Sequence, residues 1–114
     1  MECENKIEIN GVWYTREVET TDDYVIVRTY SAGVFAGNLK SRNWKEVELE
    51  NARRFWYWEG AASLSQMAME GTSNPGGCKF PCEVKSITLT EAIEVIPCTE
   101  VAEKSIKGVP VWKE

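Results

Sequence analysis

The residues best suited to hold a ligand form one continuous stretch, 53–58, in which two arginines precede four aromatic side chains. A guanidinium can stack on an aromatic ring while it donates a pair of hydrogen bonds to a phosphate, which a lysine does less well. Nucleotide bases also stack on such rings, each contributing about 1–3 kcal/mol. The residue types therefore predict a site for a flat, negatively charged molecule. The alternative is that the rings are core and the arginines reach past them to solvent.

If this stretch is extended, its side chains alternate between two faces, each of which combines one arginine with aromatic rings. One face carries Arg54, Trp56 and Trp58, and the other carries Arg53, Phe55 and Tyr57. The pattern leaves open which arginine faces a ligand. Because they lie on opposite faces, alanine substitutions of the two are expected to differ strongly in their effect on binding.

A third arginine, Arg28, lies within an alternating segment directly before the glycine-rich stretch 31–37. Consecutive backbone amides in such a turn can form an anion-binding nest, so Ser31 and Gly33 join Arg28 in the candidate site. The stretch lacks the ending of a P-loop and the fingerprint of a dinucleotide site. The alternative is that Arg28 pairs with one of the acidic residues.

Three more residues complete the candidate site. Phe80 follows Lys79 in a loop, where an exposed ring beside a cation would form a platform for a base. The alternative is that this ring fixes the loop to the domain. Thr99 lies at the start of a predicted helix, where its hydroxyl either contacts a ribose or phosphate or caps the helix. Lys107, near the end of that helix, adds positive charge or is simply solvated.

The chain offers little for catalysis. It contains no histidine, which removes the commonest general base and the usual hydrolase triads. Three residues separate Cys78 from Cys82, and Cys3 and Cys98 lie far away, a spacing unlike that of zinc sites. The sequence therefore predicts a binding protein with free thiols that is not an enzyme and requires neither a metal nor a cofactor.

The elements that would position these residues are strands first and then helices mixed with strands. The predicted strands cover 5–9, 12–18, 23–31, 34–41, 45–58 (as one or two strands), 84–90 and 92–98, with 109–112 as an edge strand. Turns are expected at Asn10-Gly11 and Arg42-Asn43. Helix signals lie between Gly60 and Gly71, with Leu64, Met67 and Ala68 as the buried stripe, and between Thr99 and Gly108. The predicted fold class is α+β, a twisted antiparallel meander with two short α-helices.

A chain of 114 residues is expected to form one domain, with an N-terminal hairpin (1–22) and a core (23–114). Apolar residues occupy both faces of the predicted sheet, and two short helices cannot cover both, so a homo-oligomer is expected, either a dimer or an assembly of dimers. The formal net charge of −5 argues against DNA, RNA or an anionic membrane as the partner. No stretch approaches the length of a membrane span, so a cytoplasmic protein is expected.

Four segments resemble a family of small phage and prophage proteins: YVIVRTYSAGVFAG, NARRFWYWEGAASLSQMAMEG, CKFP and EAIEVIPCTE. The resemblance covers about residues 23–107. That family is similar to the first described phage anti-Thoeris sponges, which block a bacterial immune pathway by sequestering its cyclic ADP-ribose-type signal. The resemblance implies an oligomer built from dimers, with pockets at subunit boundaries that hold this signal, or a cyclic oligonucleotide, without cleaving it.

Such pockets stack the adenine between an aromatic ring and an arginine and clamp the phosphates with further arginines. By that logic Phe80 and either Arg53 or Arg54 would form the stacking pair, with Arg28 as a phosphate contact. One departure is Trp44, in a turn where glycine after asparagine would suit better. Two other functions stay open: a protein-binding inhibitor of a host factor, which would use aromatic and acidic surface, and a small phage structural protein.

Overall fold

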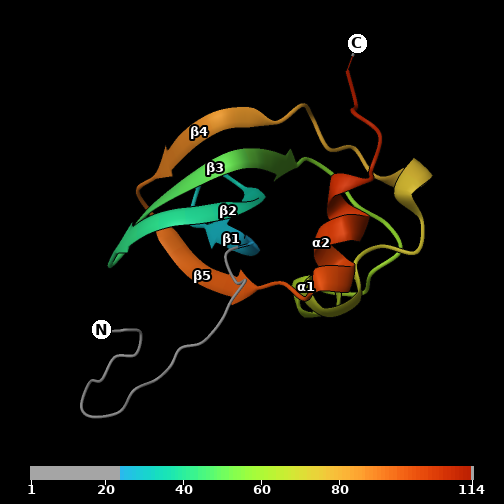
Figure 1. The fold of residues 1–114 in the computed structure, drawn as a ribbon, viewed down its shortest axis with the longest axis horizontal. Helices are drawn as coiled ribbons and strands as arrows, with labels where there is room; N and C mark the ends of the chain where they lie inside the picture. The colour runs from blue at the N-terminus through green and yellow to red at the C-terminus, as the bar shows by residue number, and fades with distance from the viewer. Residues whose placement is uncertain (1–23, 114) are drawn as a thin grey trace.

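The computed structural model describes residues 24–113, which form a five-stranded antiparallel β-sheet and two short α-helices, so the predicted α+β class is confirmed (Figure 1). The expected N-terminal hairpin lies outside the described residues. In chain order the elements are β1 (Tyr24–Thr29), β2 (Val34–Asn43), β3 (Glu46–Phe55), α1 (Leu64–Glu70), the 3₁₀ turn η2 (Pro75–Gly77), β4 (Val84–Leu89), β5 (Ala92–Pro97) and α2 (Glu100–Lys107). No helix in this part of the chain is long and apolar enough to cross a membrane.

The strand order in the sheet is β4-β3-β2-β1-β5, so β1 to β4 form the expected meander while β5 pairs with β1 at the opposite edge. Only Thr90 and Glu91 join β4 to β5. In a flat sheet the two edge strands would lie about 19 Å apart, because neighbouring strands are spaced by about 4.8 Å. Three Cα steps span at most about 11 Å. The sheet must therefore curl until β4 and β5 meet at one end, which Figure 1 shows at the left.

Backbone hydrogen bonds hold this closed end together. The amide of Ala92 donates to the carbonyl of Lys45 in the β2–β3 turn at 3.0 Å, and the amide of Tyr30 donates to the carbonyl of Glu91 at 3.0 Å. The curl encloses an apolar core to which all five strands contribute. Its buried members are Val25, Val27, Phe35, Val47, Leu49, Ala52, Leu89 and Ala92.

The outer face of β1 to β3 packs against α1, α2 and the loop between α1 and β4. The buried residues of this second core are Tyr24, Ile26, Ala36, Phe55, Met67, Ala68, Cys78, Phe80, Ile106 and Val109. One apolar face of the sheet is thus covered by curling and the other by the helices. The premise from which the sequence predicts self-association does not hold, because one chain covers both faces. A homo-oligomer stays a prediction.

An irregularity in β3 decides which of its residues face the interior. The register of β3 against β2 shifts at Asn51, whose φ is 53°. Leu49 and Ala52 both face the enclosed core, although regular alternation would place residues three apart on opposite faces. The bulge therefore turns Arg54 toward the interior of the curl and Arg53 toward the helices.

Gly37 on β2 lies opposite this bulge and permits the close approach of the two strands. A Cβ atom at this position would lie 3.0 Å from the Cα of Ala52 and 3.0 Å from the carbonyl oxygen of Glu50. Both are backbone atoms, which cannot swing away as a side chain would. The strand pairing around the bulge therefore favours glycine here, because a Cβ would force these backbone atoms to shift.

The β2–β3 turn lies two residues later than predicted. β2 continues through Asn43, and the turn consists of Trp44 and Lys45. Trp44 has a φ of 59°, a conformation that glycine adopts more easily than a bulky residue. The turn therefore does place Trp44 in a conformation better suited to glycine, as its position in the sequence indicates. The predicted strand 45–58 is also too long, because β3 ends at Phe55.

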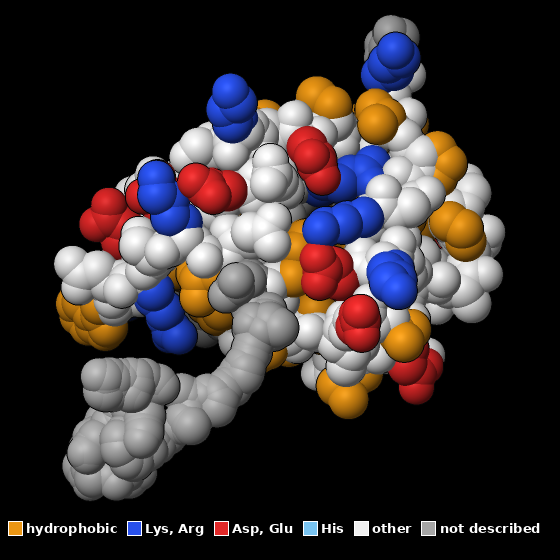
Figure 2. Space-filling model, in the orientation of Figure 1, with side chains coloured by type: hydrophobic (Ala, Val, Ile, Leu, Met, Phe, Trp, Pro, Cys, Tyr) orange, Lys and Arg blue, Asp and Glu red, His pale blue; other side chains and the backbone are white. Residues whose placement is uncertain are grey.

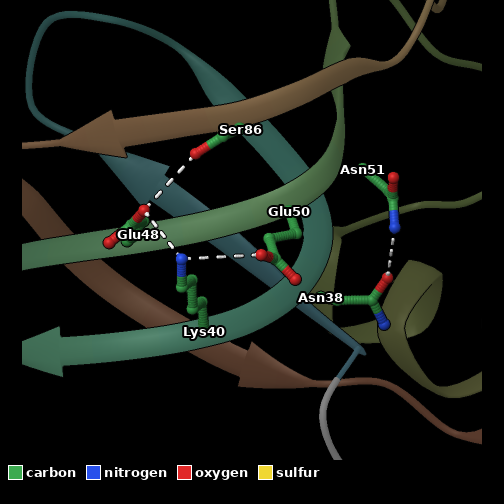
Figure 3. A network of polar contacts seen from close by, with 6 residues as sticks. All are labelled: Asn38, Lys40, Glu48, Glu50, Asn51 and Ser86. Carbon is green, nitrogen blue, oxygen red and sulfur yellow. Dashed lines mark hydrogen bonds and ion pairs between the residues drawn. The ribbon is translucent and has the colours of Figure 1, made fainter.

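The remaining outer surface of β2 to β4 is polar (Figure 3). The Lys40 ammonium lies 3.7 Å from the carboxylates of both Glu48 and Glu50, and the Ser86 hydroxyl donates to Glu48 at 3.4 Å. Exposed pairs of this kind contribute about 1 kcal/mol or less. This network covers a solvated face of the sheet.

Candidate ligand-binding site

A pocket of about 410 Å³ opens between β2, β3 and β4, at the end of the curled sheet away from the β4–β5 link. Ligand pockets usually have volumes of about 300–1,000 Å³. The residues that line it are Phe35, Ala52, Arg54, Trp56, Pro81, Cys82, Val84 and Ile87. The pocket therefore brings together two residues predicted from the sequence, Arg54 and Trp56.

Most of the lining is apolar. Phe35 and Ala52 belong to the enclosed core, so the floor of the pocket is continuous with the interior of the sheet. Arg54 is exposed, and its guanidinium carbon lies 4.6 Å from the centre of the Phe35 ring. Within residues 24–113, no carboxylate forms an ion pair with Arg54. Its donors are therefore open to an anion at the pocket.

Trp56 forms a wall of the pocket and is 63% exposed. Its ring lies parallel to that of Trp112, with the centres 6.3 Å apart and the planes inclined by 6°. The Lys79 ammonium lies 5.6 Å from the centre of the Trp112 ring. Trp112 therefore packs against Trp56 on one side and is contacted by Lys79. Neither Lys79 nor Trp112 lines the pocket, so both support the Trp56 wall from outside it.

Arg53 has the opposite role, and its assignment as a ligand contact is wrong. It is 2% exposed and all five of its N–H groups donate to main-chain carbonyls. The acceptors are Pro81 at 3.2 Å, Ile106 at 3.0 Å, Val109 at 2.8 Å, Phe80 at 2.9 Å and Pro110 at 3.4 Å. Burial lowers the pKa of Arg53. No donor remains for a phosphate, and Arg54 is the arginine of the pair that lines the pocket.

Phe80 is not a stacking platform, because its side chain is 0% exposed. Its ring stacks on that of Phe55, with the centres 4.2 Å apart and the planes inclined by 6°. The Arg53 guanidinium carbon lies 5.4 Å from the ring centre. The stated alternative is correct: this ring fixes the loop before β4 to the domain.

Arg28 and Ser31 are engaged by acidic residues of the protein. The Arg28 Nε donates to Glu94 at 2.9 Å, and the Ser31 hydroxyl donates to Glu91 at 2.8 Å. Neither residue lines the pocket that contains Arg54. The alternative of an ion pair for Arg28 is therefore the one observed.

Hydrogen bonds within the turn at Gly33 engage one of its amides, and the anion-binding nest stays a prediction. The Gly33 carbonyl accepts from the Thr29 amide at 3.0 Å and from the Thr29 hydroxyl at 2.7 Å. The amide of Ala32 donates to that same hydroxyl at 3.0 Å. Gly33 has a φ of 103°, which explains the glycine by backbone geometry.

Thr99 and Lys107 lie on the helical side of the molecule. The Thr99 hydroxyl accepts from the Ala102 amide at 3.1 Å and donates to the Met69 carbonyl at 2.7 Å, so it acts as the helix cap. Lys107 pairs with Glu103 at 2.7 Å. A hollow of about 490 Å³ beside Thr99 is lined by Cys98, Thr99, Glu100 and Glu103, and its two carboxylates disfavour an anion.

The sequence missed several members of the pocket. The only sequence signal at Cys82 is its spacing to the other cysteines. Phe35, Val84 and Ile87 carry only the signal of a strand. Phe35, Val84 and Ile87 face inward on β2 and β4. They can be assigned to one pocket only once it is known that β4 pairs with β3. The Ala52–Val84 pairing is a contact across the sheet that local periodicity does not reveal.

Of the four cysteines, Cys78, Cys82 and Cys98 lie in the described part and are free thiols. Burial raises the pKa of Cys98 to about 12. Burial also raises the pKa of Tyr24, whose hydroxyl has no hydrogen-bond partner among residues 24–113. No three potential metal ligands come together in this same range.

The fold and the pocket define a small α+β domain whose curled sheet holds a largely apolar, ligand-sized pocket, lined by one arginine that forms no ion pair within residues 24–113. The chain belongs to the family described as Domain of unknown function (DUF6948), whose model matches residues 22–106. No curated protein and no solved structure matches the chain. The matched region contains every strand described here and ends before the segment that carries Trp112.

Proposed function

We propose that this protein binds a small ligand that combines a flat ring with an anionic group and holds it unchanged. The pocket carries the proposal, because Arg54 and Trp56 meet there over an apolar floor. A nucleobase would lie against this floor and the Trp56 wall, while Arg54 donates to a phosphate oxygen. The ligand class we propose is a cyclic ADP-ribose-type or cyclic oligonucleotide signal.

The biological role we propose is that of a phage anti-defence protein that sequesters such a signal in the host cytosol, as the resemblance implies. A sequestering protein needs slow release, which a rigid site favours because little ordering occurs on binding. Phe35 stacked against Arg54 and Trp112 stacked against Trp56 supply such support. Among residues 24–113, the pocket lining contains neither a carboxylate nor an imidazole that would act as a general base, which supports retention of the ligand without cleavage.

The distribution of charge supports a small ligand in preference to a nucleic-acid polymer. On the face shown in Figure 2, basic and acidic side chains are interspersed, and no continuous basic surface forms. The net charge of −5 agrees with this mixed surface. A polymer would be attracted to an extended basic stripe, whereas one phosphate near the pocket needs only Arg54.

The experiment is a titration with cyclic ADP-ribose and with cyclic dinucleotides, read by thermal unfolding and calorimetry. Ligand at about 100 times its dissociation constant should add about 2.7 kcal/mol to the stability of the protein. Heating the complex should release the ligand with unchanged mass. Arg54→Gln should bind about 10- to 100-fold more weakly, because a hydrogen bond to a charged group contributes about 1.5–3 kcal/mol.

Arg42→Gln is the matched control, since Arg42 is an exposed arginine at the far end of β2. It should bind like the wild-type protein. Absence of binding to every probe, or unchanged binding by Arg54→Gln, would overturn the proposal. Light scattering on the same samples measures whether the chain forms the proposed homo-oligomer.

A second candidate is a protein-binding inhibitor of a host factor. It is favoured by the exposed aromatic and apolar side chains near the pocket, Trp56, Tyr57 and Val111, since aromatic residues and arginine anchor protein interfaces. A host protein captured stoichiometrically by the wild-type chain, and lost with Trp56→Ala, would favour this function. Ligand binding in the absence of any such partner would favour the first.

A further inference from the structure

We infer that the C-terminal segment, residues 109–112, supports the ligand site from outside the pocket, and that Trp112 positions Trp56 as a wall of the pocket. This inference rests on the proposed function. Trp56 lines the pocket and stacks on Trp112, which does not line it. Trp112 therefore acts through Trp56 and is a positioning residue.

The segment is fixed to the protein through its backbone. After α2 ends, the carbonyls of Val109 and Pro110 accept from Arg53 at 2.8 and 3.4 Å. The Trp112 amide donates to the Phe80 carbonyl at 3.0 Å, and Val111 forms a parallel bridge with Phe80. These bonds hold the segment along the loop that precedes β4.

Trp56 needs this support because it lies just beyond the last residue of β3. Its backbone amide donates to the Lys79 carbonyl at 3.1 Å, but its ring is mostly exposed. An exposed ring without a neighbour changes rotamer freely, and a ligand would have to order it on binding. The parallel Trp112 ring, itself contacted by Lys79, orders it in advance.

One buried side chain connects this support to the rim of the pocket. Arg53 binds the carbonyl of Pro81, which lines the pocket, and the carbonyls of Val109 and Pro110 in the C-terminal segment. The rim and the support of the wall are therefore built on the same guanidinium.

The test uses the full chain with Trp112→Ala, Trp112→Phe and Trp56→Ala. The control is Trp44→Ala, which removes an exposed tryptophan at the opposite end of β3. Stacked indoles give an exciton couplet in the far-ultraviolet circular dichroism spectrum of the ligand-free protein. We expect the couplet to vanish equally in Trp112→Ala and Trp56→Ala and to persist in Trp44→Ala.

Calorimetry with cyclic ADP-ribose provides the second measurement. Trp112→Ala should bind about two- to tenfold more weakly, Trp112→Phe should recover part of this loss, and Trp44→Ala should bind like wild type. The inference is overturned if Trp112→Ala keeps the couplet of the wild-type protein. It is also overturned if Trp112→Ala loses the couplet but binds cyclic ADP-ribose as tightly as the wild-type protein does. A wild-type protein that shows the couplet but binds no probe overturns the proposed function, while the couplet still supports the positioning of Trp56.

Discussion

Replacing Arg53 with methionine removes the guanidinium while keeping an unbranched side chain in the buried position. We expect a large loss of stability, because this one group donates to five main-chain carbonyls. Direct contact with the ligand should be unaffected, since Arg53 does not line the pocket. The substitution therefore separates a structural arginine from its neighbour Arg54.

The size of the stability loss depends on which of the five carbonyls keep another hydrogen-bond donor after Arg53 is replaced. The Ile106 carbonyl still accepts from the Val109 amide at 3.2 Å, and the Phe80 carbonyl still accepts from the Trp112 amide at 3.0 Å. These two lose a bond to a charged donor but are not left unpaired. Their loss is expected to be about 1 kcal/mol each.

The other three carbonyls have no second donor among residues 24–113. Val109 is buried, and an unpaired buried carbonyl costs about 1–3 kcal/mol. Those of Pro81 and Pro110 belong to partly or fully exposed residues, where water can replace the guanidinium at little cost. Removal of a buried charge offsets part of the total. The expected net loss is about 3 kcal/mol.

Urea unfolding followed by tryptophan fluorescence measures this loss. With a slope of about 1–3 kcal/mol per M, the midpoint should fall by about 1–3 M. Arg54→Met is the matched control, with an expected loss of about 1 kcal/mol or less from its contact with the Phe35 ring. Arg53→Lys should lie between wild type and Arg53→Met, because an ammonium has three donors and lacks the planar fork.

Equal midpoints for Arg53→Met and Arg54→Met would refute the structural role of Arg53. So would an Arg53→Met protein within about 0.5 kcal/mol of wild type, the range of an ordinary surface substitution. An Arg53→Met protein with wild-type stability and lost ligand binding would return Arg53 to the ligand site. The expected pattern is the reverse: Arg53→Met loses stability and weakens binding only through the rim and the C-terminal segment that Arg53 holds, whereas Arg54→Met loses affinity with little loss of stability.

Three further substitutions test the fold. Gly37→Ala should destabilise the protein by about 1–3 kcal/mol in urea, because its Cβ would meet backbone atoms of β3 at 3.0 Å; Gly76→Ala, which has no atom within 4 Å of the added Cβ, should be nearly neutral. Tyr24→Phe removes a buried hydroxyl that has no hydrogen-bond partner in the described range. Thermal unfolding should therefore show equal stability or a gain of about 1 kcal/mol, and a clear loss would reveal a hydrogen-bond partner. Burial raises the pKa of Cys98 from 9.0 to about 12, so the unfolded chain releases this proton first and stability falls as the pH rises above about 9. This group contributes up to about 1.4 kcal/mol per pH unit, and Cys98→Ala should reduce the alkaline slope of the urea midpoint; an unchanged slope would contradict the raised pKa of this half-buried thiol.

Local patterns were sufficient for most of the elements. Alternation in β1 separates Val25 and Val27 from Tyr24 and Ile26, and these pairs indeed lie in different cores. The position of Thr99 leaves open a helix cap or a ligand contact, and its hydroxyl accepts the Ala102 amide as a cap does. Such features depend on neighbours within a few residues, so the sequence is enough to predict them.

The candidate site was predicted in part. The residue types identified Arg54 and Trp56, because a guanidinium beside an indole suits a flat anion wherever the two are placed. Phe80 and Arg28 were assigned incorrectly, since their roles depend on partners far away in the sequence. Phe80 packs on Phe55, and Arg28 pairs with a glutamate of β5, and neither contact has a local signature.

The sequence by itself determined five strands and two helices to within a few residues, the α+β class and the kinds of side chain available to a ligand, because each follows from periodicity and residue type. The predicted edge strand 109–112 forms only an isolated bridge at Val111. Only the tertiary structure decided that the sheet curls, because a two-residue link joins strands on its opposite edges. It also decided which arginine binds the backbone and which lines the pocket, through the bulge at Asn51. A one-residue shift in pairing reverses the face of every later side chain, and that shift is set by the partner strand.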